Sequence, residues 1–288
     1  MSEVLIAGCG YVGTALGKRL LVDGHRVWGL RRNVHLLPSR IQPIMADLSR
    51  PETLHALPSS LDYLFYVAAA DETTEASYQT TYIEGIRNLL RSLEEQNIHP
   101  RRGFFTSSTA VYAQQEGEWI DEDSPAEPSH FTGARLLQAE RLLRESIFPW
   151  TVARLSGIYG PGRTRLVEEV RQGRFTPTTS LKYYTNRIHQ EDCAGVLRHL
   201  MGLHAPDGLY LGTDHEPARL CDIADWLVQE LDLEPILKTD PLPAPENRFR
   251  TNKRCSNARL VASGYRFRFP TFREGYSALL KKGASHES

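Results

Sequence analysis

The 288-residue sequence predicts an α/β fold, a doubly wound parallel sheet with a smaller C-terminal substrate lobe. Strand-like runs alternate with helical patterns as far as residue 155, and a glycine-rich turn joins the first strand to the first helix. Beyond residue 155 the alternation loosens. Regular strand–helix alternation is typical of a parallel sheet covered on both faces. We therefore expect residues 1–155 to form the sheet domain and 156–288 mainly the lobe, partly interleaved with the sheet.

The individual elements follow from residue type and spacing. Short runs rich in β-branched and aromatic residues predict strands at 4–8, 25–30, 43–47, 62–69, 103–108 and 150–155. Helices are predicted between them at 12–22, 77–96 and 133–146, the last with an apolar stripe that includes Leu136, Ala139 and Leu143. In the lobe, "GLYLG", "LCDIADWLVQEL" and "TFREGYSALL" predict further strands and helices.

Composition excludes several classes of protein. A formal net charge of −1 gives no basic surface for a nucleic acid. No run approaches the 18 apolar residues typical of a membrane span, and the first residues lack the pattern of a signal peptide. The four cysteines, Cys9, Cys193, Cys221 and Cys255, show no metal-binding spacing, which favours reduced thiols in the cytoplasm and no metal site. "TDPLPAPEN" (239–247) is expected to be an exposed proline-rich loop.

The turn after the first strand reads "IAGCGYVGTAL", with Gly8, Gly10 and Gly13 forming G-x-G-x-x-G. The first glycine permits a tight turn, the second lets the backbone approach a pyrophosphate, and the third lets helix pack closely on strand. Tyr11 and Val12 open the helix, whose N-terminal N–H groups favour phosphate. The motif predicts a dinucleotide-binding, Rossmann-type domain over residues 1–155. A glycine-rich turn without a ligand is the alternative.

The end of the second strand indicates which dinucleotide binds. An NAD site needs a carboxylate there for the ribose 2′-hydroxyl, whereas this chain has Arg31 and Arg32. Guanidinium groups suit a phosphate monoester, so NADP is expected and NAD is less favoured. The alternative is that both arginines are simply solvated. Asp47, after the third strand, is expected either to bind the adenine or to cap the following turn.

Five further stretches keep a recognisable order: "VAAA" (67–70), "TSSTAVYA" (106–113), "ARLSGIYGPGR" (153–163), "NRIHQEDCA" (186–194) and "KRCSNARLVASGYRFRFPTFREG" (253–275). Together they resemble the extended short-chain dehydrogenase/reductase family, which includes sugar-nucleotide epimerases and dehydratases. The resemblance implies that Ala68 and Ala69 line the cofactor. It also implies that Ser108 hydrogen-bonds a substrate oxygen, with Ser107 or Thr109 in that role if the alignment slips by one. A hydroxyl that only satisfies the strand end is the alternative for Ser108.

The resemblance fails at the family's catalytic pair, Tyr-x-x-x-Lys. Phe131 stands at the tyrosine position and Arg135 at the lysine position. Arg135 can still donate to the ribose hydroxyls, while Phe131 has no proton to transfer and is expected to line the substrate. Tyr112 is the expected catalytic replacement. Other candidate donors are His130, Tyr78, Tyr82, Tyr159 and His189.

The lobe segment "NRIHQED" carries further expectations. His189 is expected at the substrate, and Asp192 is expected to cap a helix that begins at Cys193. Three arginines could contact an anionic substrate or be ordinary surface charges: Arg154, Arg163 and Arg187. The carboxylates of "DEDSP" (121–125) are expected to lie in water.

The function expected from these residues is that of an NADP-dependent oxidoreductase or epimerase-like enzyme with an atypical active site. Its partner would be a small carbonyl or sugar-type substrate. One alternative is a dinucleotide-binding sensor without hydride chemistry, and another is an interaction protein that merely retains the fold. The family resemblance makes a homodimer through the helices at 77–96 and 133–146 plausible.

Overall fold

A seven-stranded sheet organises most of the chain in the computed structural model, which describes residues 1–175, 183–206, 208–234 and 252–284. The strand order is β11-β7-β5-β4-β1-β2-β3. The strands are β1 (Glu3–Ala7), β2 (Arg26–Arg31), β3 (Gln42–Met45), β4 (Tyr63–Tyr66), β5 (Arg102–Ser108), β7 (Trp150–Leu155) and β11 (Leu209–Gly212). β1 pairs in parallel with both β2 and β4, so Ala7 lies opposite Leu30 on one side and Tyr66 on the other.

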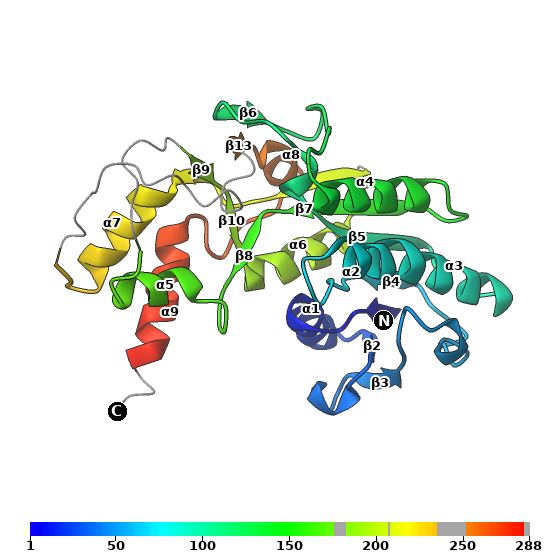
Figure 1. Cartoon of the computed structure of the whole chain (residues 1–288). Helices are drawn as coiled ribbons and strands as arrows, with labels where there is room; N and C mark the ends of the chain where they lie inside the picture. The colour runs from blue at the N-terminus through cyan, green and yellow to red at the C-terminus, as the bar shows by residue number, and fades with distance from the viewer. Residues whose placement is uncertain (176–182, 207, 235–251, 285–288) are drawn as a thin grey trace. The chain divides into compact units, whose positions relative to one another are not determined.

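Helices cover the sheet on both faces (Figure 1). They are α1 (Tyr11–Val22), α2 (Glu75–Gln79), a π-helical turn (Thr80–Glu84), α3 (Gly85–Glu95), α4 (Phe131–Arg144) and α6 (Gln190–Gly202). The strand order reverses beside β1, and right-handed crossovers then place α1 on the opposite face from α3 and α4. An ion pair between Asp23 and Arg198 ties the end of α1 to α6.

The central position of β1 explains its composition. Val4, Leu5, Ile6 and Ala7 are all fully buried, as expected for a strand with neighbours on both sides and helices on both faces. The doubly wound parallel fold predicted from the sequence is therefore confirmed.

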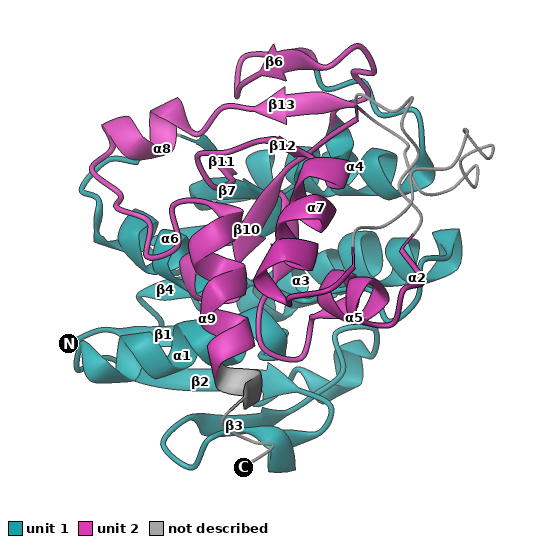
Figure 2. Cartoon of the chain, turned by 90° about the vertical axis from the view of Figure 1, so that its left-hand side faces the viewer, with its two compact units in different colours: residues 1–111, 126–155, 193–210 teal, residues 112–125, 156–192, 211–288 magenta. Residues whose placement is uncertain are grey.

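The chain divides into two compact units (Figure 2). Unit 1 comprises residues 1–111, 126–155 and 193–210; unit 2 comprises 112–125, 156–192 and 211–288. The sequence led us to expect a boundary at 155 with part of the later chain interleaved with the sheet. Residues 193–210 belong to unit 1 in line with that interleaving, whereas residues 112–125 belong to unit 2, which was not expected. The last strand of the sheet, β11, comes from "GLYLG", which we had assigned to the lobe.

Unit 2 is built from short elements. They are β6 (Glu118–Ile120), β8 (Gly157–Tyr159), α5 (Arg165–Arg171), β9 (Tyr184–Thr185), β10 (Arg187–His189), β12 (Ala218–Arg219), α7 (Leu220–Glu230), β13 (Lys253–Cys255), α8 (Ala258–Ala262) and α9 (Phe272–Ala284). The strands form two-stranded sheets, β8 with β10, β9 with β12 and β6 with β13. Tyr159, Ile223, Phe272 and Tyr276 belong to its apolar core.

Most predicted elements lie within one or two residues of the observed ones, and two differences bear on the site. The strand expected at 62–69 ends at Tyr66, because the following "VAAA" leaves the sheet as a loop. The helix expected at 77–96 begins at Glu75 and includes the π-helical turn. The proline-rich segment 239–247 lies outside the described residues.

Candidate functional site

The turn between β1 and α1 shows a different role for each glycine. Gly8 has φ +85°, and a Cβ there would lie 2.3 Å from the Cα and N atoms of Ala68. A Cβ on Gly13 would lie 2.9 Å from the Gly8 carbonyl oxygen, so close packing requires this glycine too. At Gly10 the nearest atom would be 3.9 Å away. Gly8 and Gly13 are therefore needed by the protein's own packing, whereas Gly10 leaves room for a ligand.

The N-terminus of α1 is suited to bind an anion. Gly10 is the N-cap and supplies no side-chain hydrogen bond, and the first bond along the helix runs from the Thr14 N–H to the Gly10 carbonyl at 2.8 Å. N–H groups in the first helical turn have no partner inside a helix and carry its positive dipole end. The Val12 side chain is buried, so Val12 offers only its backbone to a ligand.

The loop after β4 lies directly against this turn. Ala68 is the residue that a Gly8 side chain would strike, and Ala69 beside it is exposed. Val67 donates from its backbone to the Ala7 carbonyl at 2.8 Å, which fixes the start of the loop. The two alanines expected at the cofactor are thus adjacent to the glycine turn.

The two arginines after β2 have different partners. Arg31 donates to the Cys9 carbonyl at 3.1 Å and so braces the glycine turn. Arg32 forms a bidentate pair with Asp71 at 2.8 and 2.7 Å. That hydrogen bonding lowers the pKa of Asp71. Burial raises the pKa of the Cys9 thiol to about 11, so this cysteine stays protonated and unreactive near neutral pH.

Asp47 is part of a local turn. Its Oδ1 accepts from the Ser49 N–H at 2.9 Å and from the Ser49 hydroxyl at 2.7 Å, while Thr53 donates to its carbonyl. Of the two roles expected for Asp47, the turn role accounts for these contacts.

Ser108 ends β5, where its Oγ accepts from the Ala110 N–H at 3.1 Å. Its neighbour Ser107 points elsewhere and donates to Glu140 of α4 at 2.6 Å. Glu140 in turn pairs with Arg154 of β7, at 3.0 and 2.6 Å, and all three side chains are buried. Arg154 is therefore neither a surface charge nor a substrate contact, contrary to both alternatives from the sequence, because a buried carboxylate neutralises it.

The helix that carries Phe131 and Arg135 is well formed. α4 begins at Phe131, and the Nδ1 atom of His130 caps it by accepting from the Thr132 N–H at 3.3 Å. The Phe131 ring packs edge-on against Tyr78 of α2, with centroids 5.6 Å apart. Arg135 donates to Glu75 of α2 at 2.7 Å and to Gln138 at 2.9 Å. The cation at the lysine position thus already has a carboxylate partner.

Some candidate proton donors are buried tyrosines, and others contact the Phe131 ring. Tyr112, the expected catalytic replacement, is fully buried in unit 2 and donates to the Asp121 carbonyl at 2.9 Å, which favours a structural role. Burial raises the pKa of Tyr82 to about 12 and also raises that of Tyr159. Only His130 and Tyr78 pack against the ring at position 131 among the described candidates.

Residues of "NRIHQED" serve unit 2 itself. His189 is buried against Phe269, and its Nδ1 accepts from the Glu191 N–H at 3.2 Å. α6 begins at Gln190 rather than Cys193, so the expected capping role for Asp192 is wrong. Instead its carboxylate accepts from the Tyr265 hydroxyl and from the N–H groups of Arg268 and Phe269.

The other two arginines named from the sequence also belong to unit 2. Arg187 donates to the hydroxyls of Thr185 and Tyr276. Arg163 is exposed, and its backbone N–H closes a turn to Gly160.

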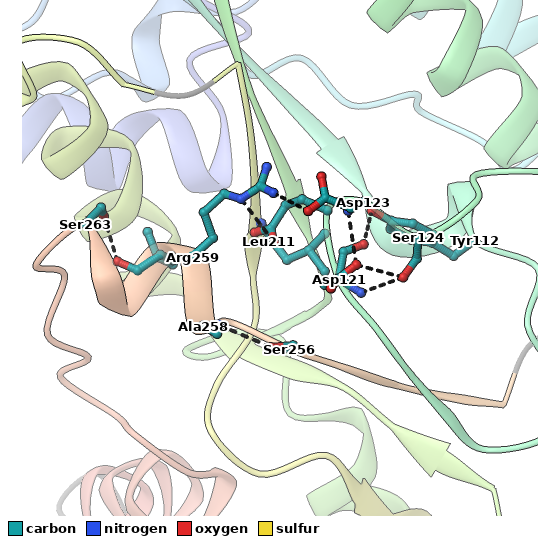
Figure 3. Close-up of polar contacts among 11 residues, drawn as sticks. Tyr112, Asp121, Asp123, Ser124, Leu211, Ser256, Ala258, Arg259 and Ser263 are labelled. Atoms are coloured by element: carbon teal, nitrogen blue, oxygen red, sulfur yellow. Dashed lines mark hydrogen bonds and ion pairs between the residues drawn. The ribbon is translucent and has the colours of Figure 1, made fainter.

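In the acidic segment 121–124, Asp121 and Asp123 are exposed as expected (Figure 3), whereas Glu122 differs from the expectation that these carboxylates lie in water. Glu122 is buried and accepts from the Leu211 N–H at 2.7 Å, with Arg259 at 3.7 Å. Burial raises the pKa of Glu122. Arg259 also pairs with Asp123 at 2.8 Å, so α8 holds this segment in place. The run of acidic residues gave no sign that the Glu122 carboxylate accepts a hydrogen bond from a backbone N–H of β11.

A buried carboxylate that the sequence reasoning missed is Asp214 in unit 2, after β11. It is 1% exposed, and its Oδ1 accepts from the Glu216 N–H at 3.1 Å. Among the described residues, Asp214 Oδ2 and the Tyr159 hydroxyl have no hydrogen-bond partner. Burial raises the pKa of Asp214 to about 8, against the smaller opposing effects of the Glu216 N–H and Arg187.

Asp214 should make stability depend on pH. The folded state keeps the proton up to pH about 8, whereas the unfolded state releases it near 3.8, so stability should fall as pH rises through this window. Each pKa unit corresponds to about 1.4 kcal/mol, which sets an upper scale of a few kcal/mol. Asp214→Asn keeps the acceptor and should flatten the slope between pH 5 and 8 in urea unfolding. An unchanged slope would show that Asp214 ionises normally.

The described residues also bear on metal binding and on membrane insertion. Within the described residues, no group of three His, Cys, Asp or Glu side chains could hold a metal ion. None of the helices described combines the length and the hydrophobicity that crossing a lipid bilayer requires.

Known proteins resemble this chain along its length. A candidate NAD-dependent epimerase/dehydratase of Methylobacillus flagellatus is 38% identical, with a TM-score of 0.83 over 98% of this chain and 99% of that one. The human epimerase family protein SDR39U1, solved with NADPH, is 22% identical, with a TM-score of 0.76 over 93% and 96% of the two chains. At 22% identity, the structural similarity to the human protein shows a shared fold and no more.

Among curated proteins, N-acetyl-alpha-D-glucosaminyl-diphospho-ditrans,octacis-undecaprenol 4-epimerase of Escherichia coli O157:H7 is 28% identical over 49% of this chain and 42% of the relative. The matched region is less than half the length of the curated relatives. The model of the "NAD dependent epimerase/dehydratase family" matches residues 4–202, which include the glycine turn, Ser108 and α4. The chain therefore belongs to the NAD dependent epimerase/dehydratase family.

Proposed function

We propose that this protein is an NADP-binding oxidoreductase or epimerase-like enzyme that acts on a carbonyl, sugar or nucleotide-sugar substrate. The observation that carries the proposal is the glycine turn, where Gly8 and Gly13 are packed against protein and Gly10 is open. A nicotinamide dinucleotide supplies hydride transfer when bound. Its pyrophosphate fits the open side of Gly10 and the N-terminus of α1, because both favour an anion.

The choice of NADP depends on the segment after β2. This segment offers Arg31 and Arg32 and no carboxylate, and guanidinium groups suit the 2′-phosphate. The human protein of the same fold was solved with NADPH, which supports a nicotinamide dinucleotide as the ligand. A sugar substrate is supported by the Escherichia coli relative, whose name describes a 4-epimerase of a glucosaminyl diphosphate.

The residues of unit 1 would share the remaining work. The Ser108 hydroxyl oxygen accepts from the Ala110 N–H, and its own O–H can donate to a substrate oxygen at the same time. Arg135 can keep positive charge beside the ribose while Glu75 neutralises part of it. Phe131 would line the substrate with an apolar ring. A homodimer through α2, α3 and α4 is the arrangement we propose by family resemblance.

The test is NADPH oxidation measured across a panel of carbonyl and nucleotide-sugar substrates. Ser108→Ala should lower kcat/KM roughly 10- to 100-fold, between the loss of an ordinary hydrogen bond and the loss of an oxyanion-stabilising donor. Ser60→Ala is the matched control, because Ser60 is exposed in a loop before β4. Equal activity of the Ser108 and Ser60 variants would remove Ser108 from the site.

One observation favours a second function, that of a dinucleotide-binding sensor without hydride chemistry. The tyrosine position holds Phe131, and general acid–base help is worth about 10²–10⁴-fold. Tight NADPH binding with no turnover on any panel substrate would favour the sensor. Efficient turnover by the unmodified protein would exclude it.

A further inference from the structure

Asp71, the ion-pair partner of Arg32, lies where it can influence cofactor choice. Asp71 follows "VAAA" after β4, and Arg32 follows β2 directly. The strand between these two is β1, so the ion pair connects segments on either side of the strand that carries the glycine turn. Neighbouring strands are about 4.8 Å apart, so β2 and β4 are separated by about 10 Å. The Arg32–Asp71 pair spans that gap.

The space outside the ends of β2, β1 and β4 is where a dinucleotide binds in this kind of fold. In doubly wound sheets, ligands bind outside the carboxyl ends of the strands, and the adenosine ribose faces the end of the second strand. The pair therefore lies beside the expected position of the 2′-substituent. Arg31 is partly buried and donates to the Cys9 carbonyl, whereas Arg32 is exposed, which makes Arg32 the more adaptable guanidinium.

Both bonds of Arg32 to Asp71 use its terminal nitrogens, NH1 and NH2, at 2.8 and 2.7 Å. These are also nitrogens that a phosphate monoester would engage in a bidentate contact. The two side chains are 62% and 63% exposed, and exposed pairs are weak. A 2′-phosphate can therefore displace Asp71, but it must compete with it. A ribose 2′-hydroxyl makes no such demand on Arg32.

We propose that Asp71 determines cofactor specificity by competing with the 2′-phosphate of NADP for Arg32. The inference rests on the proposed function, since it requires a nicotinamide dinucleotide in this site. Its consequence is that the ratio of NADP to NAD affinity is set by a residue after β4 as well as by the arginines after β2.

The test compares Asp71→Asn with the unmodified protein by calorimetric titration with NADPH and with NADH at low ionic strength. Asparagine keeps the shape and removes the charge, so the NADPH Kd should fall roughly three- to fivefold while the NADH Kd stays within twofold. Asp222→Asn is the matched control. It removes the same charge from another exposed bidentate pair, with Arg219 at 2.7 Å, and should change neither Kd.

A second background separates competition from simple repulsion. In Arg32→Gln the competed group is absent, so adding Asp71→Asn should leave the NADPH Kd within twofold. An unchanged ratio of the NADPH Kd to the NADH Kd in Asp71→Asn would overturn the inference. So would an equally large fall of the NADPH Kd when Asp71→Asn is added to Arg32→Gln. If neither dinucleotide binds the unmodified protein, the proposed function fails with it; if both bind and only the ratio fails to move, this inference alone is wrong.

Discussion

Gly8→Ala should lower the free energy of unfolding by about 2 to 5 kcal/mol. Two costs add in this estimate: about 1–2 kcal/mol for a side chain in the left-handed region and about 1–3 kcal/mol for overpacking. The new methyl group would lie 2.3 Å from the Cα and N atoms of Ala68. Since those are backbone atoms, no side-chain rotation can relieve the contact. Chemical denaturation followed by circular dichroism measures the loss.

Gly24 provides a control with nearly the same φ. Its φ is +84°, and a Cβ there would have nothing within 4 Å. Gly24→Ala should therefore show only the conformational cost of about 1–2 kcal/mol. Equal losses at Gly8 and Gly24 would mean that the loop at Ala68 can move away from the turn, and that its contact with Gly8 does not require glycine there.

Arg154→Met should cost about 3–5 kcal/mol, because it leaves the Glu140 carboxylate buried without its cationic partner. Glu140 is 2% exposed, and its remaining hydrogen bond of this set comes from Ser107. Thermal and chemical unfolding both report the loss. Arg50→Met, which breaks an exposed pair with Glu52, should change stability by no more than about 1 kcal/mol.

The paired variant Glu140→Leu with Arg154→Met sharpens this expectation. Removing both charges leaves an apolar contact, so the double variant should be more stable than Arg154→Met alone. A double variant less stable than the single one would show that the unpaired Glu140 carboxylate is not the source of the loss.

The sheet and its helices could be predicted because their signals are local. The run from Val4 to Ala7 is apolar throughout, as a strand buried on both faces requires. The glycine spacing also carries a local signal, because Gly13 packs against the Gly8 carbonyl five residues earlier, whereas the close approach of Gly8 to Ala68 joins residues far apart in the sequence. The α2–α3 region was less predictable, since nothing in its spacing revealed the π-helical turn at Thr80–Glu84.

The roles of polar residues could not be predicted in the same way, because burial and pairing join distant parts of the chain. From the sequence, Arg154 could be a substrate contact or a surface charge, because nothing local showed that Glu140, 14 residues earlier, neutralises it. Tyr112 has a hydroxyl that could act as an acid, but the packing of unit 2 buries its side chain completely. The partner of Arg32 is 39 residues away, and the arginine pair alone gave no sign of it.

Calorimetric titration of the unmodified protein with NADPH tests the central claim most directly. Gly10→Ala serves as the control, because a Cβ at Gly10 would have its nearest neighbour at 3.9 Å and would occupy the space that we propose for the pyrophosphate. We expect one NADPH per chain to bind the unmodified protein, and the Gly10 variant to remain folded but lose at least tenfold in affinity. An unmodified protein that binds neither NADPH nor NADH, or a Gly10 variant that binds as well as its parent, would contradict the account.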